Sequence, residues 1–255
     1  MNFETVILEV KDHIATITMN RPDKMNACSM QMFREIEQAL SLIEDDPEVR
    51  VVVVTGAGDK AFSAGVDLNE LNFENVAESS EWIKYDARMF RRLETIPQPV
   101  IAAINGTAFG YGCKIPIVSD LAIASSDARF GLQGIKLSAV HIITLGRGRD
   151  TMSRKDLAYL ILSGETFDAE KAAAIGMINK TVPPEDLYDE VYKLAKKIAD
   201  YPSYPVQVIK RMLHRGMDED YRYEELLSPS LLLLEDVKEG RDAFFQKRKP
   251  NFKGY

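Results

Sequence analysis

The chain has 255 residues, 45% of them hydrophobic and 28% charged, which fits a globular protein with one large domain or a domain plus a small appendage. Its formal net charge of −7 argues against general nucleic-acid binding. Two cysteines and three histidines are too few for a disulfide framework or a multi-histidine metal site. No secretory signal and no membrane-spanning apolar run is visible, so we expect a cytoplasmic protein without a membrane partner.

The first hundred residues alternate between strand and helix patterns. Residues 6–10 and 14–19 cluster β-branched side chains on either side of a polar tripeptide, which predicts a hairpin. Residues 30–43 carry apolar side chains at helical spacing, and residues 82–93 do so again. Residues 51–55 form an uninterrupted β-branched run, which is typical of a strand buried on both faces.

The remainder of the chain shows strands at first and then only helices. Short helices are predicted at 156–162 and 169–174, a strand at 177–182, and a helix from Pro183 to about residue 199. A linker is expected at 201–205, helices at 206–217 and 223–234, and a basic tail at the end. This order predicts an α/β core over residues 1–200 and a helical C-terminal region over residues 201–255.

Two glycine-containing segments, residues 61–68 and 106–114, each follow an apolar run. Glycines just before a helix let the backbone approach a ligand closely and leave N–H groups pointing outward at the helix start. Two such N–H groups converging on one carbonyl oxygen would stabilise an enolate or a tetrahedral oxyanion. The alternative is two ordinary tight turns.

Several motifs, in order, resemble the crotonase superfamily, also called the enoyl-CoA hydratase/isomerase family. The matching stretches are NRPDKMNA, AFSAGVDL, AAINGTAFGYG, SDLAIASSDARFG, LSGETFDAEKAAAIGMINKTV and AFFQKRKPNFKG. The resemblance implies an α/β spiral of ββα units with a C-terminal helical trimerisation region, assembled as a homotrimer or a dimer of trimers. It implies an acyl-CoA thioester as the substrate, with CoA part of that substrate and no separate cofactor.

The resemblance also assigns site residues. It implies that the backbone N–H groups of Ala64 and Tyr111 form an oxyanion hole. It implies CoA phosphate contacts from Lys24 and, out of a neighbouring subunit, contacts from Phe245 and Lys249. The full set of implied substrate-binding residues is Lys24, Ala27, Ala61, Phe62, Ser63, Val66, Leu68, Gly110, Gln133, Gly134, Phe245 and Lys249. No metal is implied.

The chain departs from the family pattern at its two catalytic glutamates. Lys114 and Gly134 stand at those two positions, and His141-Ile142 replaces the usual proline-glycine pair of the next loop. Ordinary addition of water needs an acid and a base at the two glutamate positions, and this chain has no carboxylate at either.

His141 is the best candidate to replace the missing acid, because imidazole titrates near neutral pH and can protonate an enolate. A tyrosine aligns there in relatives that decarboxylate methylmalonyl-CoA, and an aspartate aligns there in naphthoate synthases. The alternative is a histidine packed between its apolar neighbours. Lys114 would ordinarily be exposed, but pointing into the site it would pair with a second carboxylate on the substrate. His214 is expected at the surface of a helix.

These residues leave three functions open. The first is enolate chemistry driven by carbon–carbon cleavage, such as decarboxylation, which needs only an oxyanion hole and one proton donor. The second is an atypical enoyl-CoA hydratase or isomerase that uses His141 or another group. The third is a non-catalytic protein that binds CoA esters. The apolar run around Leu226, Leu227 and residues 231–234 favours a homotrimer or a pair of trimers.

Overall fold

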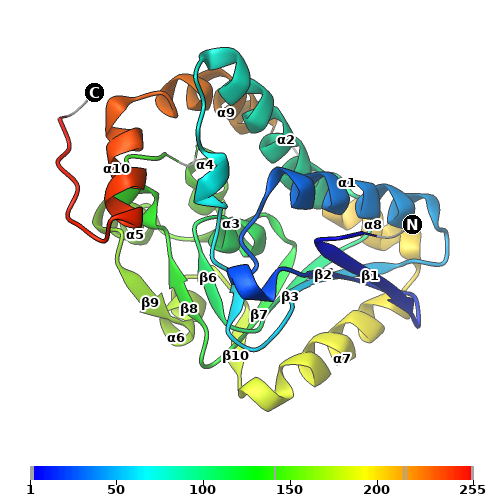
Figure 1. Ribbon diagram of the computed structural model, residues 1–255. Coiled ribbons are helices and arrows are strands. Elements are labelled where there is room, and N and C mark those ends of the chain that lie inside the picture. The colour runs from blue at the N-terminus through cyan, green and yellow to red at the C-terminus, as the bar shows by residue number, and fades with distance from the viewer. Residues whose placement is uncertain (1–2, 141, 215, 217, 254–255) are drawn as a thin grey trace.

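Two sheets with helices around them make up the computed structural model, which describes residues 3–140, 142–214, 216 and 218–253 (Figure 1). The larger sheet has the strand order β1-β2-β3-β5-β7-β10. Its strands are β1 (Val6–Lys11), β2 (Ile14–Met19), β3 (Val51–Gly56), β5 (Val100–Ile104), β7 (Leu121–Ser125) and β10 (Lys180–Val182). The predicted hairpin is confirmed by antiparallel β1 and β2, whereas all other neighbours in this sheet pair in parallel.

The smaller sheet has the order β4-β6-β8-β9. Its strands are β4 (Ala61–Ser63), β6 (Thr107–Phe109), β8 (Arg129–Gly131) and β9 (Thr166–Asp168). Three of them directly follow a strand of the larger sheet in the chain and precede a helix. The units β3-β4-α2, β5-β6-α3 and β7-β8-α4 therefore repeat one ββα pattern, which confirms the expected α/β spiral.

The helices surround these sheets and continue alone to the C-terminal end. They are α1 (Met30–Asp45), α2 (Val76–Thr95), α3 (Tyr111–Val118), α4 (Ile142–Thr151), α5 (Arg154–Ser163), α6 (Ala169–Ala174), α7 (Leu187–Ala199), α8 (Ser203–Leu213), α9 (Asp218–Leu231) and α10 (Glu235–Phe245). Among the residues that the model describes, no helix combines the length and the apolar character needed to cross a membrane.

Strand β3 explains how the core is divided. Its side chains alternate between the two faces of the sheet, so Val52 and Val54 join one hydrophobic cluster while Val51 and Val53 join another. The first cluster includes apolar residues of α1, α2 and α3, and the second includes the buried face of α7. The predicted burial of residues 51–55 on both faces is therefore confirmed.

The C-terminal region differs from the prediction in two places. Helix α8 begins at Ser203, inside the expected linker, because a proline at position 205 is tolerated in a first helical turn. Residues 235–245, expected as part of the tail, form α10. Figure 1 shows α10 on the same side of the molecule as β8 and β9 and far from α8.

A buried network of charges holds α8 against the core. His214 lies next to the end of α8, and its Nε2 is 2.8 Å from Asp120 Oδ1 and its Nδ1 3.6 Å from Glu94 Oε1. Arg147 binds both oxygens of Glu94, at 2.5 and 3.0 Å, and Lys210 lies 2.7 Å from Asp120 Oδ2. With only 17% of its side chain exposed, His214 is not the surface residue that the sequence suggested, because it lies between the carboxylates of Asp120 and Glu94, which are 10% and 3% exposed.

Candidate functional site

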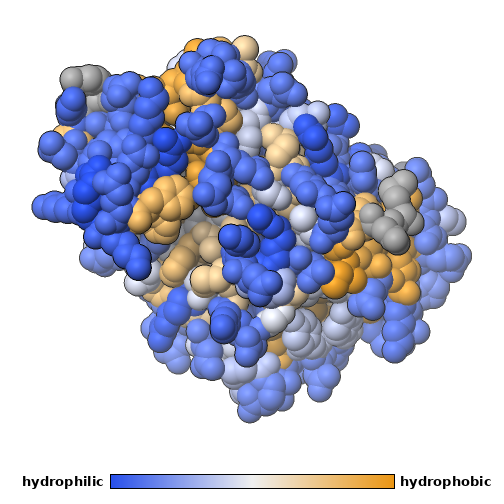
Figure 2. Space-filling model, in the orientation of Figure 1, coloured by the Kyte–Doolittle hydropathy of each residue, from blue (hydrophilic) through white to orange (hydrophobic). Residues whose placement is uncertain are grey.

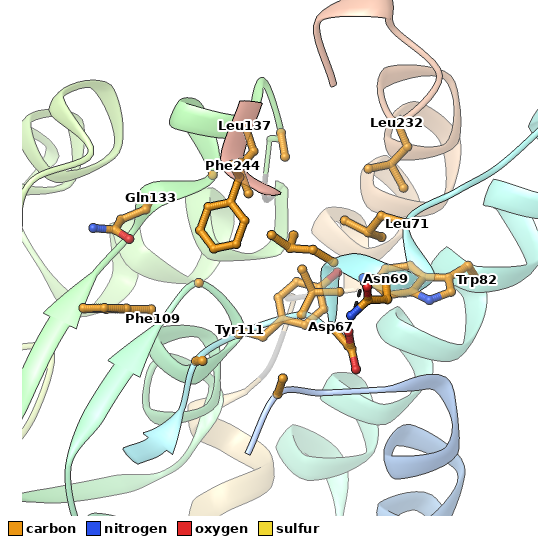
Figure 3. Close-up of a pocket in the computed structure, with 18 of the residues that line it drawn as sticks. Asp67, Asn69, Leu71, Trp82, Phe109, Tyr111, Gln133, Leu137, Leu232 and Phe244 are labelled. Carbon is orange, nitrogen blue, oxygen red and sulfur yellow. Dashed lines mark hydrogen bonds between the residues drawn. The ribbon is translucent and has the colours of Figure 1, made fainter. Parts of the chain in front are cut away.

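A cavity of about 480 Å³ lies where the two glycine-containing segments meet the C-terminal helices. Its walls are mainly apolar, with Tyr111 between Phe109 on one side and Trp82 on the other, and with Phe244 and Leu137 opposite (Figure 3). Figure 2 shows hydrophobic residues gathered around a hollow in this face of the molecule. An apolar cavity with a few polar groups is the usual form of a small-molecule site.

Close backbone contact brings the two glycine-containing segments together. A side chain at Gly65 would lie 2.8 Å from the Phe109 carbonyl oxygen and 3.4 Å from the Tyr111 nitrogen. A side chain at Gly112 would lie 2.3 Å from the Ser63 carbonyl oxygen. Only glycine permits this approach at either position. The two segments, residues 61–68 and 106–114, therefore lie in close contact, while the convergence of their N–H groups on one oxygen stays a prediction.

The hydrogen bonds of the backbone after β4 contradict one of the two predicted oxyanion donors, the Ala64 N–H. The Ala64 N–H donates to the Met25 carbonyl at 2.9 Å, so it is already occupied. The Gly65 N–H donates to Ser63 Oγ at 3.2 Å, and the Asp67 N–H donates to the Cys28 carbonyl at 2.8 Å. Ala64 lines the cavity as predicted, but its N–H is held by the loop after β2.

Val66 is placed differently. Cys28 forms a parallel bridge with it by bonding to the carbonyl of the residue before it and the N–H of the residue after it. In a parallel ladder the bracketed residue turns its own N–H and C=O away from that partner strand. Val66 lines the cavity, and its N–H has no acceptor among the residues that the structure describes.

Tyr111 is the first residue of α3, directly after Gly110, whose φ of +52° is a conformation that favours glycine. The N–H groups of a first helical turn have no acceptor within the helix. Tyr111 lines the cavity and is 4% exposed. Its ring stacks on Trp82 with the centroids 5.9 Å apart, and its hydroxyl donates to Asp86 Oδ2 at 3.1 Å.

Lys114 follows neither expectation made for it. It is 0% exposed and does not line the cavity. Its Nζ lies 3.2 Å from both carboxylate oxygens of Asp86, which is also fully buried, and 4.1 Å from the centre of the Phe90 ring. The cation is thus neither on the surface nor pointed at a substrate, because a carboxylate from α2 binds it beneath the cavity.

Gly134 lines the cavity together with Gln133. Both belong to a 3₁₀ helix over Gln133–Leu137, after β8. His141 lies outside the described residues, so its role stays a prediction of the sequence. Its neighbour Val140 lines the cavity.

Asp67 is the one carboxylate among the described lining residues, and it already has partners. Arg21 Nη2 donates to its Oδ2 at 2.9 Å, and the Asn69 amide donates to its Oδ1 at 2.8 Å. Burial pushes the pKa of this carboxyl upward, but the bonds from Asn69 and Arg21 outweigh burial and hold the pKa below its ordinary value. Asp67 is therefore an ionised structural group, poorly suited to accept a proton.

Helix α10 of the same chain contributes side chains to the wall of the cavity. Phe244 and Phe245 both line the cavity, whereas the resemblance placed Phe245 on a neighbouring subunit. Arg241, on the same helix, donates to the Leu71 carbonyl at 2.7 Å and to Asn72 Oδ1 at 3.0 Å, which ties α10 across to the loop before α2. Lys249 is exposed and does not line the cavity.

Most predicted substrate-binding residues thus surround one cavity, namely Lys24, Ala27, Val66, Leu68, Gly110, Gln133, Gly134 and Phe245, together with Ala64 and Tyr111. Ala61, Phe62 and Ser63 do not line it, since they form β4 and are buried. The sequence reasoning missed the apolar wall, in particular Leu71, Trp82, Ile83, Phe109, Leu137, Leu231, Leu232 and Phe244. The leucine run at 231–234 is the signal for this wall in the sequence, although such a run is equally typical of a subunit contact.

Known proteins share this whole fold. Residues 9–255 match the family model described as enoyl-CoA hydratase/isomerase. The short-chain-enoyl-CoA hydratase of Clostridium acetobutylicum is 36% identical over 98% of this chain and 97% of its own length. The carnitinyl-CoA hydratase structure from Mycobacterium avium is 34% identical, with a TM-score of 0.86 over 98% of this chain and 99% of its own.

A third similar protein has a different reaction in its name. The structure of a methylmalonyl-CoA decarboxylase in complex with 2-nitronate-propionyl-CoA is 27% identical, covers 100% of both chains and gives a TM-score of 0.87. The family match covers nearly the whole chain, and the ββα spiral agrees with it. The chain therefore belongs to the enoyl-CoA hydratase/isomerase family and is a crotonase-fold enzyme that acts on CoA thioesters.

Proposed function

We propose that the acyl part of a CoA thioester occupies the apolar cavity and that its thioester oxygen binds between the N–H groups of Val66 and Tyr111. Both residues line the cavity, and the close approach at Gly65 brings their segments together. Two N–H donors at such a place stabilise negative charge that develops on the oxygen. Lys24, which is exposed and lines the same cavity, and Lys249 are the proposed contacts of the CoA phosphates.

The reaction that we propose is carbon–carbon cleavage of the acyl group, in the form of decarboxylation. In a 2-carboxyacyl-CoA, the bond between C2 and the carboxylate carbon breaks, CO2 leaves, and the electron pair of that bond becomes the enolate of the thioester. A proton added at C2 then gives the saturated acyl-CoA. This path needs no base, because loss of CO2 itself creates the enolate.

One observation carries this choice over hydration. The only carboxylate among the described lining residues is Asp67, and Arg21 and Asn69 already occupy it. The resemblance to the family implies that Lys114 and Gly134 stand at the two positions where its ordinary hydratases have glutamates. With no carboxylate poised to activate water among the described lining residues, the donor pair is the main catalytic device that we propose.

The mainly apolar wall also favours loss of the substrate carboxylate. Of the described lining residues, Lys24 alone is a cation, and Lys114 is bound to Asp86 outside the cavity. A carboxylate surrounded by apolar side chains loses its hydration, whereas CO2 does not need any, and the charge moves to the N–H donors. His141 is the proposed donor of the proton to C2.

Hydration by an unusual acid or base is the second candidate, since the similar proteins from Clostridium acetobutylicum and Mycobacterium avium are both named hydratases. A non-catalytic role in binding CoA esters is the third. A panel of 2-alkylmalonyl-CoA and enoyl-CoA esters separates all three. Release of CO2 from the first group supports the proposal, addition of water to the second group supports hydration, and binding without turnover supports the third.

A further inference from the structure

Beneath the cavity, one carboxylate connects two residues of the helix that carries the proposed oxyanion donor. Asp86, on α2, accepts the Tyr111 hydroxyl at 3.1 Å and lies 3.2 Å from Lys114 Nζ with each of its oxygens. Tyr111 and Lys114 are three residues apart on α3, so their side chains share one face of its first turn. The carboxylate therefore holds the first turn of α3 at two points.

The surroundings make this connection rigid. Asp86 and Lys114 are fully buried, and Tyr111 is 4% exposed. The Lys114 ammonium lies 4.1 Å from the centre of the Phe90 ring and 5.0 Å from that of Tyr111, in the range of a cation–π contact. Trp82 stacks on the Tyr111 ring. Close-packed interiors transmit small displacements, so a change at Asp86 reaches the start of α3.

We propose that Asp86 is a positioning residue for the oxyanion hole. By binding the Tyr111 hydroxyl and the Lys114 ammonium, it fixes the first turn of α3 and with it the direction of the Tyr111 N–H toward the thioester oxygen. This inference rests on the proposed function and explains a second feature. The resemblance to the family implies that Lys114 replaces a catalytic glutamate of the hydratases. In this chain Lys114 instead anchors α3, whose first residue is the proposed oxyanion donor Tyr111.

The test compares two CoA ligands that differ in the oxygen bound by the hole. One is a CoA compound bearing a nitronate, which carries negative charge where an enolate oxygen would be. The other is the matching saturated CoA thioether, which has no oxygen there. The single tryptophan of the sequence, Trp82, lines the cavity, so its fluorescence reports the dissociation constant of each ligand without any turnover.

The variants are Asp86→Asn, which keeps the shape but removes the charge, and Tyr111→Phe, which keeps the ring but removes its bond to Asp86. We expect each to weaken nitronate binding by roughly 10- to 100-fold, since small misplacements of a site cost about that much. Affinity for the thioether should change by less than about 3-fold, because it makes no bond to the N–H donors. The control Tyr192→Phe removes another tyrosine hydroxyl, 2.8 Å from Thr16 Oγ1 and away from the cavity, and should change neither affinity.

The outcomes are distinct. If the Asp86 and Tyr111 variants lose affinity equally for both ligands, the cavity has lost its shape. If their affinity for both ligands is unchanged, Asp86 positions nothing. Either result overturns the inference. If the unmodified protein itself binds nitronate and thioether equally, the proposed oxyanion hole fails and the positioning role falls with it. If the unmodified protein prefers the nitronate and both variants keep that full preference, the hole stands and only the role of Asp86 is wrong.

Discussion

The Ala64 amide donates its N–H to the Met25 carbonyl at 2.9 Å, and this bond moves the proposed oxyanion donor two residues along the chain, to Val66. The N–H groups of Ala64, Gly65 and Asp67 all have acceptors within the protein. The bridge with Cys28 turns the Val66 N–H to the other side of its segment. Which N–H is available was decided by the path of the loop after β2.

Replacing the Val66 N–H by an ester oxygen, with the α-hydroxy acid that matches valine, tests this assignment. The side chain is kept and only the donor is lost, so turnover should fall by roughly 100- to 1,000-fold, as for loss of one oxyanion-hole donor. The same exchange at Ala64 removes the bond to Met25 and should lower stability by about 1 kcal/mol with a much smaller effect on turnover. Rate constants and thermal unfolding of the two proteins decide it, and a larger loss of turnover at Ala64 would contradict the assignment.

His141 is expected to deliver the proton to the enolate. His141→Gln should lower kcat by roughly 100- to 10,000-fold, the usual contribution of a positioned acid or base, with KM nearly unchanged provided that KM reports binding. His13→Gln, at a partly exposed histidine of the β1–β2 hairpin, is the matched control. Steady-state kinetics on the 2-carboxyacyl-CoA that is turned over best gives the answer. A normal kcat for His141→Gln would show that the histidine only packs.

The His214 network predicts a loss of stability as the pH rises. Burial lowers the pKa of this imidazole, but its hydrogen bond to Asp120 and the nearby negative charge of Glu94 prevail and raise the pKa from 6.5 to about 9. Arg147 and Lys210 also face the network, bound to the same two carboxylates. Because the folded state holds the proton more tightly, the stabilisation is complete below about pH 6.5 and disappears as the pH rises through about 9.

We expect this pH-dependent stabilisation to be about 2 to 3 kcal/mol. The shift of the pKa alone corresponds to a somewhat larger free energy, but the ring is partly exposed, so water screens its interaction with the two carboxylates. Urea unfolding between pH 6 and 10 measures it in the unmodified protein and in His214→Gln. The free energy of unfolding of His214→Gln should be lower than that of the unmodified protein at pH 6. It should also lack the part of the decline that deprotonation of His214 causes as the pH rises. Parallel stability curves for the two proteins would show that the imidazole is not charged in the folded state.

Assembly through the C-terminal helices is expected from exposed apolar residues. Leu226 on α9 is 71% exposed and Leu213 on α8 is 67% exposed, although both lie in helices with apolar residues around them. Patches of this kind mark contact surfaces. We therefore expect a homotrimer or a dimer of trimers in sedimentation velocity experiments at micromolar concentration. Leu226→Asp should shift the protein to smaller species, whereas Leu42→Asp on α1 should not. A monomeric unmodified protein would refute the prediction.

The sequence predicted the elements that local pattern determines. The valine run of β3 is typical of a doubly buried strand, and the glycines at 65 and 112 permit the close backbone approach that the structure has. The sequence could not predict the partner of Lys114, because Asp86 lies 28 residues away on another helix and carries no motif. The choice of Val66 over Ala64 likewise depended on Met25, a contact between distant segments. The role of Phe244 depended on α10, which was expected as a tail.

We expect that this enzyme does not hydrate enoyl-CoA esters in the ordinary way, and one rate comparison tests this most directly. Hydration of crotonyl-CoA is measured beside the short-chain-enoyl-CoA hydratase of Clostridium acetobutylicum at equal enzyme concentration. Without a carboxylate at position 114 or 134, we expect a rate at least about 1,000-fold lower. The same preparation should release CO2 from a 2-alkylmalonyl-CoA. Hydration as fast as that of the Clostridium enzyme would contradict the account.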